Sequence, residues 1–150
     1  MLNLSKKILV AIDGSPQSDK AAEEAVRLAM ASGQKFRSKV YAIIVLPGSK
    51  SPSFTDFFPS VPATEQADWE QKSKRIFYVV EKPAAEAEVP LENIIAYGDP
   101  VEEILGFAEE GEVDAIVIGS SGKGRVKRTF LGSVSSRVAM QAYCSVYIVR

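Results

Sequence analysis

Apolar positions along this chain form two kinds of segment that alternate from one end to the other. Five segments are short continuous apolar runs rich in β-branched residues, a pattern typical of strands covered on both faces. Between them lie four stretches whose pattern is helical. The predicted strands span residues 7–12, 39–46, 91–97, 114–119 and 145–149, and the predicted helices span about 16–31, 65–82, 100–110 and 132–142.

Local start and stop signals support the helix bounds. Ser15-Pro16 and Asp99-Pro100 each offer a side-chain N-cap followed by proline at the first helical position. Gly33 and Gly111 are stop signals. Pro83 should end or bend the second helix, because proline lacks the amide hydrogen that a helix interior uses.

The alternation of strands and helices predicts a parallel sheet with helices on both faces, an α/β three-layer sandwich of the Rossmann-like or flavodoxin-like type. With 150 residues, the chain is expected to form a single domain over residues 1–150. Right-handed crossovers restrict the winding, and we predict the strand order 3-2-1-4-5. A ligand crevice then lies at the carboxyl ends of the first and fourth strands, where the winding direction reverses.

One segment, residues 47–64, does not fit this alternation. It contains four prolines and four serines, so it is predicted to be a long loop inserted after the second strand. It also contains Phe54, Phe57 and Phe58, although a disordered linker would have few aromatic residues. We expect these rings to pack on the domain or on a partner subunit.

Two scarcities in the composition exclude whole classes of chemistry. The chain has no histidine, which excludes a Ser-His-Asp triad, a Cys-His dyad and any histidine-ligated metal site. It has one cysteine, Cys144, so no internal disulfide can form. Cys144 lies in an apolar segment, where it is either a buried packing residue or a reactive thiol.

Charge is divided unevenly along the chain. All 19 acidic residues precede residue 115, whereas residues 115–150 contain six cations and no acid. This division indicates an anionic partner for the C-terminal part, unless the basic loop only balances an acidic protein. The basic residues form no domain-wide face, so nucleic acid is not an expected partner. There is no apolar run long enough to span a membrane and no signal peptide, so we expect a cytoplasmic protein without a membrane partner.

The candidate chemistry lies between the fourth strand and the last helix. Gly119 and Gly122 flank a turn that leaves the strand, and Gly132-Ser133 opens the helix. Phosphates bind where backbone N–H groups converge, and a helix N-terminus supplies such groups with a favourable dipole. Ser121, Ser133 and Ser135 could donate further hydrogen bonds. The spacing is neither a Walker A loop nor G-x-G-x-x-G, and it is not a G-x-S-x-G elbow.

Gly119-x2-Gly122-x9-Gly132-Ser133 resembles the nucleotide-binding signature of the universal stress protein family, G-x2-G-x9-G-[ST]. The resemblance covers nearly the whole chain and includes "VAIDGS", "YGDP", "VDAIVIGSSGKG" and "LGSV". It implies a dimer that is joined through the C-terminal edge strand. The expected ligand is ATP, or alternatively AMP or ADP, with Mg²⁺ or Mn²⁺ held at the phosphates. It implies a regulatory or stress-response protein with an unidentified protein partner.

The resemblance assigns a role to nine positions. By similarity, Asp13 lies next to the ribose and adenine, Ile12 borders the base and Val45 packs on it. The positions matched to the phosphates are Gly119, Gly122, Gly132, Ser133, Val134 and Ser135. Ser121 is a further candidate for the site because of its hydroxyl group. No residue is predicted to be catalytic or to ligate a metal directly. Hydrolysis is expected to be slow at most, because no general base and no Walker lysine is present.

Each of these positions also has a structural interpretation. Asp13 could cap the turn into the first helix, Gly119 could serve close packing, and Gly132-Ser133 could be only a helix start. Many relatives have histidine where this chain has Ile44 and Ser121. These differences leave the backbone of the glycine turn intact but remove a polar contact or a stacking surface for the nucleotide. Two other classes of protein stay open: a dimeric interaction module that binds no nucleotide, and a flavin-dependent electron carrier with the same sheet topology.

Overall fold

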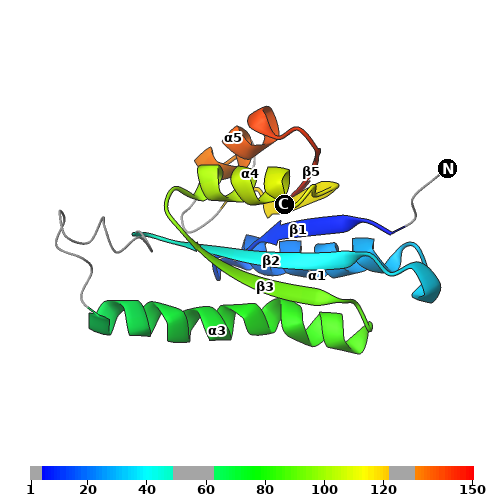
Figure 1. The fold of residues 1–150 in the computed structure, drawn as a ribbon, viewed down its shortest axis with the longest axis horizontal. Helices are drawn as coiled ribbons and strands as arrows, with labels where there is room; N and C mark the ends of the chain where they lie inside the picture. Colours follow the sequence, from blue (N-terminus) through cyan, green and yellow to red (C-terminus); the bar gives the residue numbers. More distant parts are fainter. Residues whose placement is uncertain (1–4, 49–62, 122–130) are drawn as a thin grey trace.

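The computed structural model describes residues 5–48, 63–121 and 131–150, and a five-stranded parallel sheet forms its centre (Figure 1). The strands lie in the order β3-β2-β1-β4-β5, which confirms the predicted 3-2-1-4-5 winding. Every pair of neighbouring strands is parallel. The strands are β1 (Lys7–Ala11), β2 (Lys39–Leu46), β3 (Leu91–Tyr97), β4 (Ala115–Gly119) and β5 (Ser145–Val149).

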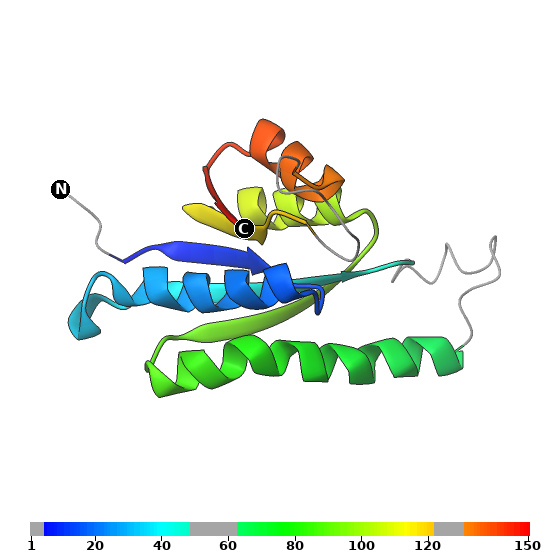
Figure 2. The ribbon, with the colours of Figure 1, turned by 180° about the vertical axis from the view of Figure 1, so that it is seen from behind.

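The helices cover both faces of the sheet. Helices α1 (Pro16–Met30) and α3 (Ala63–Glu86) lie on one face, and α4 (Pro100–Glu110) and α5 (Ser133–Gln141) lie on the other (Figures 1 and 2). A short 3-10 helix, η1 (Gln34–Phe36), joins α1 to β2. In the described part of the chain, no helix is long and apolar enough to cross a membrane.

Two apolar cores, one on each face, hold the three layers together. Val10 and Val80 are fully buried between the sheet and the α1–α3 layer. Leu9 and Val138 are fully buried between the sheet and the α4–α5 layer. Leu9 and Val10 are consecutive residues of β1, so the central strand is covered on both faces, as its continuous apolar run predicts.

Cys144 lies at the edge of the second core. The side chain is half-buried and packs against the apolar cluster beneath α4 and α5. Burial raises the pKa of its thiol, which keeps the sulfur in the less reactive protonated form at neutral pH. A packing role is therefore the better of the two interpretations.

The prediction that the second helix ends near residue 82 is wrong, because α3 continues through Pro83 to Glu86. Proline removes one backbone hydrogen bond, but the next turn is held by the Ala87 amide, which donates to the Pro83 carbonyl at 3.0 Å. Val80 and Ala84, on either side of Pro83, are buried in the α1–α3 core, so this part of the helix is held by tertiary packing. The other predicted ends differ from the observed ones by a residue or two.

The predicted loop over residues 47–64 is also shortened. Helix α3 already begins at Ala63, two residues before its expected start. Phe54, Phe57 and Phe58 lie outside the described residues, so their predicted packing stays a prediction.

Candidate functional site

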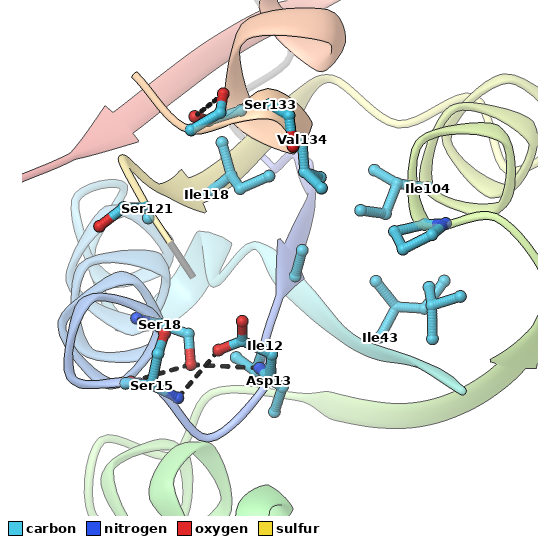
Figure 3. Close-up of a pocket in the computed structure, with 16 residues that line it drawn as sticks. Ile12, Asp13, Ser15, Ser18, Ile43, Ile104, Ile118, Ser121, Ser133 and Val134 are labelled. Atoms are coloured by element: carbon cyan, nitrogen blue, oxygen red, sulfur yellow. Dashed lines mark hydrogen bonds between the residues drawn. The ribbon is translucent and has the colours of Figure 1, made fainter. Parts of the chain in front are cut away.

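A cavity of about 370 Å³ opens at the carboxyl ends of β1, β2 and β4, at the point where the winding direction reverses. This is the position at which a doubly wound sheet forms its ligand crevice. Figure 3 shows the residues that line it. They are Ala11, Ile12, Asp13, Ser15, Ser18, Ile43, Val45, Pro100, Ile104, Ile118, Gly119, Ser121, Gly132, Ser133, Val134 and Ser135.

The turn from β1 into α1 forms one wall of the cavity, and its own side chains hold it in place. The Asp13 carboxylate accepts a hydrogen bond from the Ser15 amide at 2.8 Å. Ser15 caps α1 by accepting from the Ser18 amide at 3.2 Å, and the Ser18 hydroxyl accepts from the Asp13 amide at 3.2 Å. Gly14 has φ of 85°, a left-handed conformation that favours glycine in this tight turn. The predicted capping role of Asp13 is thus present, and it occupies one of the two carboxylate oxygens.

The end of β4 and the start of α5 form the opposite wall, and they are in direct contact. The Gly132 amide donates to the Ser120 carbonyl at 2.6 Å. A Cβ atom on Gly132 would lie 3.2 Å from that carbonyl oxygen and 3.3 Å from the Cα of Ser121. The two small-residue bends therefore meet beside the cavity, and glycine allows this close approach.

Helix α5 begins differently from α1 and α4. Ser15 caps α1, and the Asp99 carboxylate caps α4 by accepting from the Glu102 amide at 3.0 Å. The N-cap of α5 is Gly132, which has no side-chain hydrogen bond to the helix. Among the described residues, none accepts a hydrogen bond from the amides of Ser133 and Val134, and both residues line the cavity. A helix N-terminus with free amides is a favourable place for an anion.

The cavity has a polar side and an apolar side (Figure 3). Asp13, Ser15 and Ser18 lie together on one side, whereas Ile43 and Ile104 lie across from them. Such a division suits a ligand with one flat apolar part and one polar part, because few polar groups are needed to fix its orientation.

Negative charge is concentrated at the β1 end of the cavity. Asp13 is the one ionisable side chain among the lining residues that the structure describes. Burial raises the pKa of the nearby Asp19 carboxyl, and the Asp13 and Glu23 carboxylates raise it further. An anionic group is therefore favoured at the α5 end and disfavoured near Asp13.

Most of the predicted site residues line the cavity. They are Ile12, Asp13, Val45, Gly119, Ser121 and the run 132–135, whereas Gly122 lies outside the described residues. The predicted donation from Ser135 to a ligand stays a prediction. Its hydroxyl lies 2.8 Å from the Ser120 carbonyl oxygen and is oriented to donate to it.

Sequence reasoning missed the residues that α4 and the strand interiors contribute. Pro100 and Ile104 enter the cavity from the first turns of α4, and Ile43 and Ile118 enter from β2 and β4. In the sequence they are ordinary apolar positions, and only the strand order brings them to one crevice. Ser15 was predicted as the N-cap of α1, whereas no role was predicted for Ser18.

No group of three or more histidine, cysteine or acidic side chains able to hold a metal ion occurs in the described ranges. Asp13 offers the one carboxylate among the described lining residues.

The sheet order and the crevice at its reversal point define a doubly wound α/β protein of the Rossmann-like class. The chain belongs to the universal stress protein family, whose model matches residues 5–150. Universal stress protein MJ0531 of Methanocaldococcus jannaschii is 34% identical over 99% of this chain and 84% of its own length. Universal stress protein YxiE of Bacillus subtilis is 35% identical, over 96% of this chain and 98% of its own length.

Solved structures of the family share the fold. Universal stress protein UspA from Lactobacillus plantarum superposes with a TM-score of 0.78 at 26% identity, and the match covers all of both chains. A universal stress protein solved in complex with cAMP has a TM-score of 0.68 at 24% identity, covering 97% of each chain. The Archaeoglobus fulgidus protein in complex with dAMP has a TM-score of 0.68 at 21% identity, covering 98% of this chain and 99% of its own.

Proposed function

We propose that this protein binds an adenine nucleotide in the cavity, with ATP as the preferred ligand and AMP or ADP as weaker ones. The observation that carries the proposal is the start of α5, where Ser133 and Val134 line the cavity and the helix has no side-chain cap. Charged phosphate oxygens are the acceptors that gain most from such donors. The α-helices α1 and α4 each use a side-chain cap instead.

The division of the cavity gives the nucleotide one orientation. The base lies against the apolar side formed by Val45, Pro100 and Ile104. The ribose lies near Asp13, whose second carboxylate oxygen can accept from a hydroxyl group. The phosphates lie at α5, away from the acidic end. The phosphates would carry Mg²⁺ or Mn²⁺, which would neutralise part of their charge.

Related structures support an adenine nucleotide. Two universal stress proteins of the same fold hold cAMP and dAMP. Both ligands contain adenine and a phosphate, the two parts for which the apolar side and the α5 amides are suited.

We propose a binding protein and not an enzyme. The cavity's described lining has no basic side chain and one carboxylate, which already accepts the Ser15 amide. Any hydrolysis should be slow, because no described group is placed to orient or deprotonate an attacking water. Bound nucleotide would instead bias a stress-response dimer or its contact with a protein partner.

Calorimetry on nucleotide-stripped protein tests the proposal directly. We expect ATP with Mg²⁺ to bind more tightly than AMP, and AMP more tightly than adenosine, because each phosphate adds acceptors at α5. GTP should bind less well than ATP, because the apolar side offers few polar partners for its base. Absence of binding by all four ligands would leave the interaction module as the better hypothesis.

The homodimer in this proposal forms through the β5 edge. β5 is an edge strand, and unpaired strand edges are natural pairing surfaces. Tyr147 on β5 is 45% exposed, and Met140 and Tyr143 just before it are 85% and 59% exposed. Exposed apolar side chains on an edge strand, such as Tyr147, favour association.

Tyr147→Glu should therefore weaken dimerisation at least about tenfold, because it puts a charge into an apolar contact. Tyr78→Glu is the matched control, since Tyr78 is 61% exposed on α3, away from the β5 edge. Sedimentation velocity over a range of protein concentrations gives both dissociation constants. A monomeric wild type, or equal effects of the two substitutions, would contradict a dimer at β5.

A further inference from the structure

The Ser120 carbonyl joins the two bends of the proposed phosphate site. It accepts the Gly132 amide at 2.6 Å and lies 2.8 Å from the Ser135 hydroxyl oxygen. On its other side, the Ser120 amide donates to the Val149 carbonyl at 2.7 Å, which fixes the turn to the end of β5. The start of α5 is therefore attached to β4 through one carbonyl oxygen with two donors.

Ser135 lines the cavity, but its side chain is almost fully buried and its hydroxyl lies within hydrogen-bond distance of two backbone carbonyls. It is 2% exposed, and its hydroxyl has a single proton. Both acceptors within reach belong to the protein: the Ser120 carbonyl at 2.8 Å and the Gly132 carbonyl at 3.1 Å. Each of these carbonyls already accepts one backbone amide, that of Gly132 at the Ser120 carbonyl and that of Ser136 at the Gly132 carbonyl. The shorter distance to the Ser120 carbonyl makes it the better acceptor for the Ser135 hydroxyl.

We infer that Ser135 is a positioning residue for phosphate binding, which holds the uncapped start of α5 against the end of β4 through the Ser120 carbonyl. This inference rests on the proposed function. Without the hydroxyl, the carbonyl keeps only the Gly132 amide, and the two bends can separate. The Ser133 and Val134 amides then lose their fixed direction toward the phosphates, while the apolar side of the cavity is unchanged.

Ser135→Ala should therefore lower the affinity for ATP about tenfold, the effect of one lost buried hydrogen bond, and leave adenosine affinity within about twofold of wild type. Ser135→Thr keeps the hydroxyl and should restore most of the ATP affinity. Ser136→Ala is the matched control, because it removes a hydroxyl from the next residue of α5. Among the described residues, the Ser136 hydroxyl is not seen to form a hydrogen bond. Calorimetry with the two ligands on all four proteins gives the comparison.

The outcomes separate the two ideas. If wild type binds neither ATP nor adenosine, the proposed function and this inference both fail. If wild type binds ATP, two results would contradict only the positioning role. In the first, Ser135→Ala binds ATP as tightly as wild type. In the second, its affinities for ATP and adenosine fall by the same factor. Thermal unfolding without ligand shows whether Ser135→Ala is folded. If Ser135→Ala does not fold, Ser135→Cys replaces it in the experiment, because a thiol is a weaker hydrogen-bond donor than a hydroxyl. We then expect a loss of ATP affinity smaller than tenfold, with adenosine affinity unchanged. Unchanged ATP affinity of Ser135→Cys would overturn the inference.

Discussion

Replacement of Gly119 by alanine should lower the free energy of unfolding by about 2–3 kcal/mol, the upper range for overpacking a well-packed site. A Cβ atom on Gly119 would lie 2.9 Å from the carbonyl carbon and from the Cβ of Gln17, and 3.0 Å from its carbonyl oxygen. Two of these three atoms belong to the backbone of α1, so the clash cannot be relieved by turning a side chain. The helix or the strand end must move instead.

Gly106→Ala is the matched control for this prediction. Gly106 lies within α4, and no atom lies within 4 Å of the position that its Cβ would take. Alanine should stabilise that helix by about 0.5–1 kcal/mol, because glycine is a poor helix former. Urea unfolding of the three proteins measures both effects. A loss at Gly119 below about 0.5 kcal/mol, the size of an ordinary surface substitution, would show that the packing of α1 on β4 is looser than described.

The same contact explains why Gly119 is both a packing residue and a residue of the site. Close packing of α1 on the end of β4 brings the turn after β1 beside the turn after β4. Both turns line the cavity. The packing interpretation and the binding interpretation of this glycine are therefore compatible.

The strands and their order could be predicted because their signal is continuous along the sequence. β2 and β3 begin and end where the apolar runs predict, and the alternation with helices fixes a parallel sheet. Pro83 shows the limit of local signals. Its position predicts a helix end, yet the burial of Ala84 in the core carries α3 onward. Tertiary packing is not visible in a local stop signal.

The site was predicted in part for a related reason. Glycine spacing located the bends, because the need for close approach restricts the residue type. The apolar side was missed, because Pro100 and Ile104 differ from other apolar residues only in where the fold places them. The role of Ser135 could not be read from the sequence either. Which acceptors a hydroxyl can reach depends on the folded backbone around it, and the Ser135 hydroxyl lies 2.8 Å from the Ser120 carbonyl oxygen.

The second large effect concerns a single backbone amide. Ser133 is the first residue of α5, a position at which proline is tolerated. The preceding Gly132 has φ of −64° and ψ of 164°, an extended conformation that suits a residue before proline. Ser133→Pro should therefore keep the fold while it removes one amide that faces the cavity. We expect the affinity for ATP to fall about tenfold or more, since a hydrogen bond to a charged group contributes about 1.5–3 kcal/mol.

Ser133→Ala is the control that isolates the amide, because both substitutions remove the hydroxyl and only proline removes the N–H. Adenosine serves as the ligand control, because it has no phosphate to lose the bond. The most direct measurement is calorimetric titration of ATP and adenosine into wild type, Ser133→Ala and Ser133→Pro under the same conditions. If the start of α5 holds the phosphates, ATP affinity is lowest for Ser133→Pro while the three proteins bind adenosine alike. Equal ATP affinity of Ser133→Pro and Ser133→Ala, with both folded, would contradict it.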